Sequence, residues 1–163
     1  MEVRKTRPEE LDAVMELYDQ GRRFMRQNGN QNQWIKGYPS RELVQEDIRL
    51  GRSYVAEEDG MLDAVFCFFY GENADPTYAD IDGAWIGHGP YGVLHRIASS
   101  GRVPGMVDKC SDWCLEQWPD LRIDTHRDNQ PMQRALERCG FQFCGVVTIE
   151  DGSERMAYEK LKK

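Results

Sequence analysis

The segment from Ile97 to Val107 has the residue types of a phosphate-binding loop. An apolar strand runs into a turn that carries Gly101 and Gly105, and the turn opens directly onto a helix. The N–H groups in the first turn of a helix have no partner within the helix, and they lie at the positive end of its dipole. A pyrophosphate placed there finds several donors and a favourable field. The segment therefore predicts a diphosphate site.

A second segment of the same kind follows further along the chain. Residues Asp124 to Phe141 again indicate a strand, a turn and a helix, and they end in Gly140-Phe141. One such loop alone is weak support for a binding site, because most glycine loops between a strand and a helix only reverse the chain. The second segment strengthens the functional interpretation of the first.

Together the two segments resemble the GNAT superfamily of acyl-CoA-dependent N-acyltransferases. Arg102-x-x-Gly105-x-Val107 stands where that family has a (Gln/Arg)-x-x-Gly-x-(Gly/Ala) loop that grips the CoA pyrophosphate. Asn129 to Gly140-Phe141 matches the family's second helix. Four further stretches resemble a bacterial branch of the family: Gln33-Trp34, Tyr38-Pro39-Ser40, His95 to Ala98, and Asp124-Thr125-His126.

The resemblance implies one α/β domain over residues 1–163, with a mixed central sheet of about seven strands flanked by helices in the order β-αα-βββ-αβ-α-ββ. Hydrophobic periodicity and turn residues predict the same alternation. Strands are expected at 3–6, 53–57, 61–70, 91–98, 121–125, 142–150 and 155–161, and helices from Pro8, after the capping Ser40, at 105–118 and at 130–139. Residues 71–90 have no clear periodicity, and loops of this length are often functional.

The resemblance also implies acetyl-CoA as the acyl donor, with no metal. The pantetheine arm would lie along the central strand at His95, Arg96 and Ile97. The pyrophosphate would meet the loop residues Arg102, Val103, Pro104, Gly105, Met106, Val107 and Asp108. Asn129 would cap the second helix and could also contact the cofactor.

Three residues depart from the family pattern. Pro104 has no N–H to donate, and Val107 replaces a small residue that lets phosphate approach the backbone. Leu136 occupies the position of the family's usual general acid, a tyrosine. These departures leave the strength of CoA binding and the source of the thiolate's proton open.

His95 is the first choice for a general base, because imidazole changes its protonation state near neutral pH. Alternation along the central strand predicts that Tyr91, Val93, His95 and Ile97 share one face. A packed histidine without a catalytic role is an equal alternative, and a Tyr91–water relay is the competing base.

Four further side chains are candidates for binding the acceptor: Trp34, Tyr38, Trp85 and His126. Aromatic rings can stack against a cation and would suit an amine. Each tryptophan could equally fix a loop onto the core, which is the commoner use of this residue.

Composition limits the remaining options. A net charge of −7 disfavours a nucleic-acid surface, and no apolar run is long enough for a membrane span. Five cysteines, an odd number, fit a cytoplasmic protein, and Cys110 and Cys114 have no second ligand pair that would suggest zinc. The closing hairpin around Asp151-Gly152 offers an edge that could pair in a homodimer.

Three functions follow from these observations. The first is transfer of an acetyl group from acetyl-CoA to a small primary amine, by direct attack in a ternary complex. The second is a CoA-binding sensor or assembly module with little turnover, suggested by Pro104, Val107 and Leu136. The third is acetylation of a protein N-terminus or lysine, which requires an open groove.

Overall fold

The computed structural model describes residues 1–163 and contains one eight-stranded sheet with the strand order β1-β2-β3-β5-β6-β8-β7-β4. The strands are β1 (Glu2–Lys5), β2 (Ser53–Glu58), β3 (Met61–Gly71), β4 (Asp82–Gly83), β5 (Tyr91–Ser99), β6 (Asp120–Thr125), β7 (Gln142–Thr148) and β8 (Glu154–Leu161). The helices are α1 (Leu11–Gln27), α2 (Arg41–Arg49), α3 (Met106–Gln117) and α4 (Gln130–Arg138), with short 3₁₀ turns η1 (Pro8–Glu10) and η2 (Pro76–Asp80). The expected order is confirmed, and the two-residue β4 makes the sheet one strand larger than expected.

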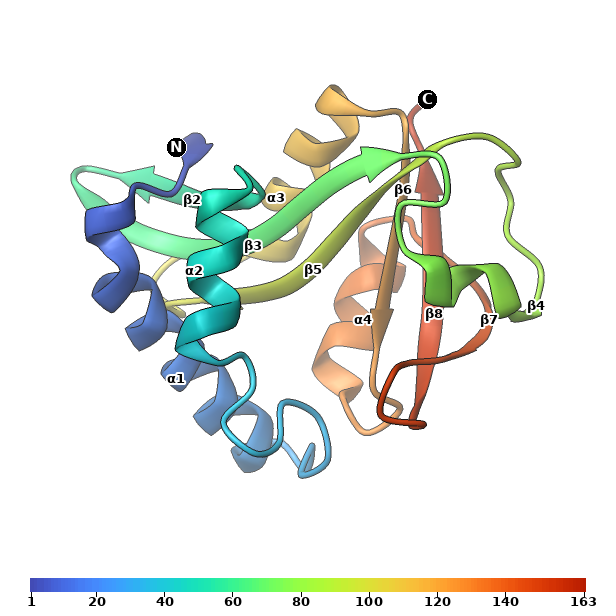
Figure 1. Cartoon of the computed structure of the whole chain (residues 1–163), viewed down its shortest axis with the longest axis horizontal. Helices are drawn as coiled ribbons and strands as arrows, with labels where there is room; N and C mark the ends of the chain where they lie inside the picture. Colours follow the sequence, from blue (N-terminus) through green and yellow to red (C-terminus); the bar gives the residue numbers. More distant parts are fainter.

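The helices cover the sheet in two layers. α1 and α2 lie on one face together with η2, while α3 and α4 lie on the other (Figure 1). On the α1 side, Val14 and Tyr18 pack against Val55 of β2 in one buried cluster. On the α3 side, Cys110 and Cys114 are fully buried in a second cluster and so belong to the core face of α3.

Local capping places the helices that border the site. The Ser40 side chain accepts a hydrogen bond from Leu43 N at the start of α2, and Asn129 accepts one from Met132 N at the start of α4. Gly105 is the N-cap of α3 and has a φ of 74°, in the left-handed region that glycine enters without a steric penalty.

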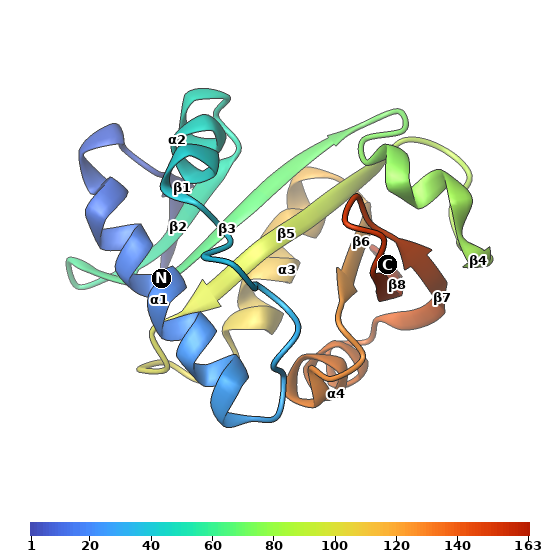
Figure 2. The same ribbon diagram turned by 60° about the horizontal axis from the view of Figure 1, so that its bottom comes forward.

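The two central strands separate along their length. β5 and β6 are the one parallel pair of the sheet, and they are joined only at Gly92↔Leu121 and Val93↔Arg122. Beyond these residues β5 and β6 diverge, and Figures 1 and 2 show the resulting V-shaped opening. The backbone of β5 past Val93 therefore has no strand partner on this side.

A bulge in β5 lies within this opening. Val65 pairs with Ala98 but Cys67 pairs with His95, so β5 has one residue more than β3 here, and Arg96 has a φ of 51°. The bulge breaks the alternation of side chains. Tyr91 and Val93 pack in a cluster with Tyr78, whereas Ile97 packs on the α3 side. The prediction that Ile97 shares a face with Tyr91, Val93 and His95 is therefore wrong.

The expected free edge of the closing hairpin is covered over two residues of β7. β8 lies inside the sheet beside β6, and β4 pairs with Val146 and Gly145 on the outer side of β7.

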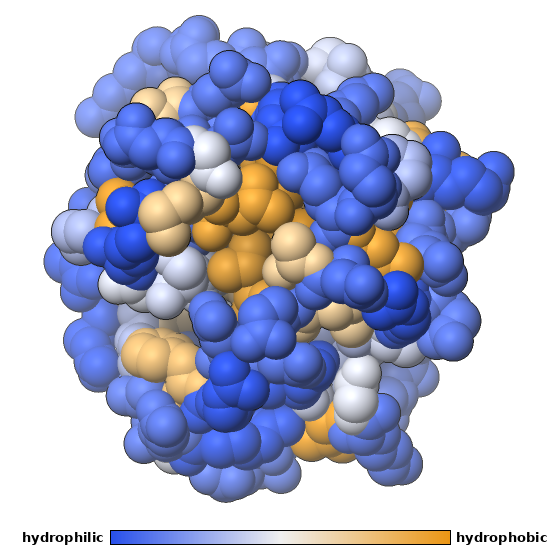
Figure 3. Space-filling model, turned by 90° about the vertical axis from the view of Figure 1, so that its left-hand side faces the viewer, coloured by the Kyte–Doolittle hydropathy of each residue, from blue (hydrophilic) through white to orange (hydrophobic).

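None of the helices is long and apolar enough to span a membrane. Hydrophilic side chains cover most of the face seen in Figure 3 and surround a smaller apolar area near its centre.

Candidate active site

A cavity of about 670 Å³ lies between α1, the end of β5, the first turn of α3 and one side of α4. Most of the residues expected to bind the cofactor line it: Ile97, Val103, Pro104, Gly105, Met106, Val107, Asp108 and Asn129. Arg23 and Phe24 of α1 and Met132 and Arg138 of α4 also line it, and none of these four was predicted as a site residue from the sequence. The V-shaped opening and the glycine turn thus border one space.

Unpaired backbone amides converge at the start of α3. The N–H groups of five residues have no hydrogen-bond partner in the structure: Val103, Gly105, Met106, Val107 and Asp108. All five residues line the cavity. A Cβ built on Gly105 would meet no atom within 4 Å, so the turn faces open space. This arrangement is suited to the oxygens of a diphosphate, and the loss of one donor at Pro104 leaves it intact.

Arg102 has a different place from the one expected. Its guanidinium forms a two-point contact with Asp63, with Nε–Oδ1 at 3.0 Å and Nη2–Oδ2 at 2.9 Å. Asp63 is buried, and Arg102 does not line the cavity. The side chain therefore anchors the loop to β3, while its own N–H is bonded to Ser100 Oγ at 3.1 Å.

His95 precedes the bulge of β5 and, unlike Ile97, does not line the cavity. Two carboxylates flank its ring. Nε2 is 2.8 Å from Asp75 Oδ2, and Nδ1 is 3.8 Å from Asp124 Oδ2. Tyr78 Oη donates to the same Asp124 oxygen at 2.6 Å. Three segments that are distant in sequence thus meet at the opening between β5 and β6.

The protonation states follow from these contacts. Burial raises the pKa of Asp75, but the hydrogen bond and the charge of His95 outweigh it and hold the pKa below its ordinary value. The ionised carboxylate only accepts, so Nε2 of His95 carries the proton of this bond, and Nδ1 has a free lone pair whenever the ring is neutral. Burial and the neighbouring Asp124 raise the pKa of Tyr78 well above its ordinary value, so Tyr78 stays a donor.

Tyr91 serves Asp75 rather than the opening. Its hydroxyl donates to Asp75 O at 3.0 Å and accepts from Asp75 N at 3.2 Å. The Arg122 guanidinium lies over the Tyr91 ring, 3.9 Å from its centre. The hydroxyl thus fixes the backbone that carries Asp75.

Gln33 connects the α1–α2 segment to the end of β6. Its Oε1 accepts from Asn129 Nδ2 at 3.1 Å, from Asn30 Nδ2 at 2.9 Å and from His126 N at 3.4 Å. The His126 ring turns back on its own chain, where Nδ1 accepts from Asp128 N at 3.0 Å. Asn129 therefore both caps α4 and joins this network beside the cavity.

Comparison with known proteins decides the family. No family model and no curated protein matches the chain. Among solved structures, a GNAT-family acetyltransferase from Streptococcus agalactiae 2603 is 34% identical, with 99% of this chain and 95% of that chain covered and a TM-score of 0.88. The chain belongs to the GNAT family of acetyltransferases.

More distant GNAT structures share the fold. AAC(6')-Ib, solved with ribostamycin and coenzyme A, is 17% identical over 98% of this chain and 92% of that chain, with a TM-score of 0.64. A ribosomal-protein-alanine N-acetyltransferase from Brucella melitensis is 15% identical over 99% of each chain, also with a TM-score of 0.64. At these identities the likeness shows the fold alone.

The aromatic residues predicted to bind the acceptor, and Leu136, mostly pack against the rest of the protein. Trp34 is buried against Tyr18, with ring centres 5.6 Å apart, so it fixes its loop to the core of this GNAT protein. Trp85 donates to Tyr78 O at 2.8 Å. Tyr38 is exposed, and its hydroxyl accepts from Arg96 Nη1 at 3.0 Å. Leu136 is fully buried in the α3-side core.

Proposed function

We propose that this protein is an N-acetyltransferase that moves an acetyl group from acetyl-CoA to a primary amine by direct attack in a ternary complex. The five unpaired amides at the start of α3, facing a cavity of about 670 Å³, carry the proposal. They offer donors for the diphosphate of the coenzyme. The AAC(6')-Ib structures with coenzyme A and with acetyl-CoA support this assignment of the donor.

The opening between β5 and β6 gives the pantetheine arm a route to His95. Residues of β5 past Val93 have unpaired edges there, and Ile97, Ala98 and Ser99 line the cavity that leads toward them. Acetyl-CoA supplies an activated thioester. The chain's own groups must orient the amine, remove its proton and keep the reacting carbonyl in place.

His95 acts as the general base in this proposal. An alkyl amine is mostly protonated at neutral pH, so it must lose a proton before its nitrogen can attack. Nδ1 of His95 accepts that proton, while Asp75 at Nε2 and Asp124 near Nδ1 stabilise the imidazolium. Attack by the neutral amine forms the C–N bond and places a positive charge on the nitrogen. The C–S bond then breaks and the thiolate leaves, while the nitrogen gives its excess proton to solvent and solvent protonates the thiolate.

The thiolate can leave without a dedicated acid. Leu136 supplies no proton where the family usually has tyrosine. A thiol has an ordinary pKa near 8.5, so its thiolate is a tolerable leaving group that solvent can protonate. Tyr78 is committed to Asp124 and is not needed for this step.

Thiol release from acetyl-CoA across a panel of primary amines tests the proposal. We expect amine-dependent release that requires His95. A protein that binds CoA but releases thiol neither with the small amines nor with a lysine-containing peptide would instead be the sensor or assembly module. Activity on the peptide alone would favour acetylation of proteins.

A further inference from the structure

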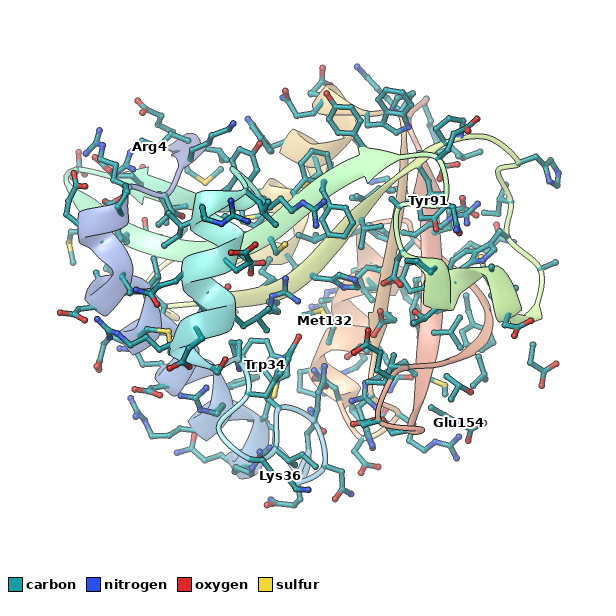
Figure 4. The ribbon with its side chains drawn as sticks, viewed as in Figure 1. Arg4, Trp34, Lys36, Tyr91, Met132 and Glu154 are labelled. Atoms are coloured by element: carbon teal, nitrogen blue, oxygen red, sulfur yellow. The ribbon has the colours of Figure 1, made fainter.

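A second pocket, of about 430 Å³, lies between the last turns of α1 and the segment that follows it. Its wall is formed by Arg22, Arg23, Arg26, Gln27, Trp34, Lys36 and Gly37. Figure 4 labels Trp34 and Lys36 on the loop beside the end of α1. We call this the basic pocket, because four of its seven lining residues are cations.

The positive charge of the basic pocket is largely uncompensated. The chain as a whole has a net charge of −7, so four clustered cations run against its composition. Asp19, which pairs with Arg22, is the one carboxylate in an ion pair with them. The C-terminal end of a helix offsets only about half a charge. One carboxylate against four cations leaves three positive charges, so the pocket keeps an excess of positive charge after the helix end is included.

Arg26 holds the far wall of the basic pocket in place. Its Nη1 donates to Asn30 O and Gln33 O, both at 2.8 Å, and its Nη2 donates to Trp34 O at 3.0 Å. Trp34 and Lys36 have φ angles of 54° and 56°, a region that bulky residues rarely adopt. Three hydrogen bonds therefore keep a strained segment folded over the cations.

The remaining cations are free to bind a ligand. Arg23 and Lys36 are exposed and make no hydrogen bond or ion pair through their side chains in the structure. Burial lowers the pKa of Arg22, and the neighbouring charges of Arg26 and Arg23 lower it further, as expected for cations that repel one another. A bound anion would relieve that repulsion.

The basic pocket adjoins the large cavity. Arg23 and Gln27 line both of them, and they lie one helical turn apart on α1. We propose that the basic pocket binds an anionic group, a phosphate or a carboxylate, of one of the two reactants. This inference rests on the proposed function for the identity of the reactants. The anion is either the 3′-phosphate of the donor or an anionic group on the acceptor amine, and arginine and lysine suit both.

Calorimetry on the full chain distinguishes the two sources. Arg23→Gln and Lys36→Gln each remove a charge that has no partner, so both variants should fold. Arg134→Gln is the matched control, because Arg134 is exposed on α4, has no ion pair and lines neither cavity. Dissociation constants are measured for CoA, for 3′-dephospho-CoA, and for inorganic phosphate added to protein saturated with CoA.

Two outcomes support the proposal. If the donor supplies the anion, Arg23→Gln and Lys36→Gln weaken CoA binding about tenfold but leave 3′-dephospho-CoA binding unchanged. If the acceptor supplies it, CoA binding is unchanged, while inorganic phosphate binds the CoA-saturated wild type and the control but not the two variants.

Other outcomes overturn it. Phosphate that fails to bind the CoA-saturated protein, together with equal CoA affinities in all variants, would show that the basic pocket takes no anion. If CoA itself does not bind the wild type, the proposed function fails. Inorganic phosphate binding to the free protein that depends on Arg23 and Lys36 would then still establish the anion site, and its absence would refute that site too.

Discussion

Asp75→Asn is the substitution that tests the catalytic proposal most selectively. Asparagine keeps the size of the side chain, and its Oδ1 can still accept from Thr77 N, as Asp75 does at 3.0 Å to cap η2. Its Nδ2 then stands in place of the Oδ2 that faces Nε2 of His95, and an amide nitrogen only donates. The substitution therefore removes the acceptor at Nε2 together with the negative charge that stabilises the imidazolium when the amine gives up its proton.

The size of the effect follows from the distance and the burial of the pair. Two unit charges about 4 Å apart interact by about 1 kcal/mol in water and about 4 kcal/mol near a protein surface. The side chains of His95 and Asp75 are 20% and 16% exposed, so solvent screens part of this interaction. We take about 2 kcal/mol, which corresponds to a fall of about thirtyfold in kcat.

Thiol release from acetyl-CoA, measured with the best amine of the panel, gives kcat and KM separately. We expect kcat to fall and the KM for acetyl-CoA to stay within about twofold, because Asp75 does not line the cavity. Asp80→Asn is the matched control, since Asp80 is exposed on the same η2 turn and should be silent. An unchanged kcat for Asp75→Asn, or a loss that appears only in the KM for acetyl-CoA, would refute the reasoning.

Three further predictions follow from the site and its surroundings. His95→Ala should lower turnover by a factor of about 10² to 10⁴ and leave CoA affinity in calorimetry unchanged; equal turnover would remove His95 from its role. Gly105→Glu should abolish CoA binding, because it adds an anion and a side chain at a φ of 74°, whereas Gly152→Glu, at a φ of 84° in a hairpin turn away from the cavity, should not. Burial, followed by the hydrogen bond with Glu159, raises the pKa of Asp120 to about 8. Between the ordinary pKa of an aspartate and this raised value, the native state keeps a proton on Asp120 that the unfolded state has released. The free energy of unfolding should therefore fall by up to about 1.4 kcal/mol per pH unit as the pH rises above 4, and Asp120→Asn should flatten this slope in urea titrations; a slope equal to that of the wild type would contradict the assignment.

Local features of the site could be predicted from the sequence. The glycine turn, the start of α3 and the capping role of Asn129 depend on residues that are close together in the chain, so their types and spacing are sufficient. The same holds for the alternation of helices and strands, which follows hydrophobic periodicity. Resemblance to the GNAT family added the order of the elements, and the structure confirms it.

Contacts between distant segments could not be predicted in the same way. The carboxylates beside His95 come from η2 and β6, and nothing in the local pattern of Asp75 or Asp124 pairs them with it. The contact between Arg102 and Asp63 joins residues on different elements and withdraws an expected phosphate ligand from the cavity. The extra residue at Arg96 reverses the face of Ile97, because one inserted residue shifts the alternation of everything after it.

The central claim is that the unpaired amides at the start of α3 bind the diphosphate of coenzyme A. Titration calorimetry of the wild-type chain with CoA and acetyl-CoA tests it directly. The account predicts saturable binding at one site with a dissociation constant between about 1 μM and 1 mM, and loss of that binding in Gly105→Glu. An absence of binding heat at millimolar ligand, or equal binding by Gly105→Glu, would contradict it.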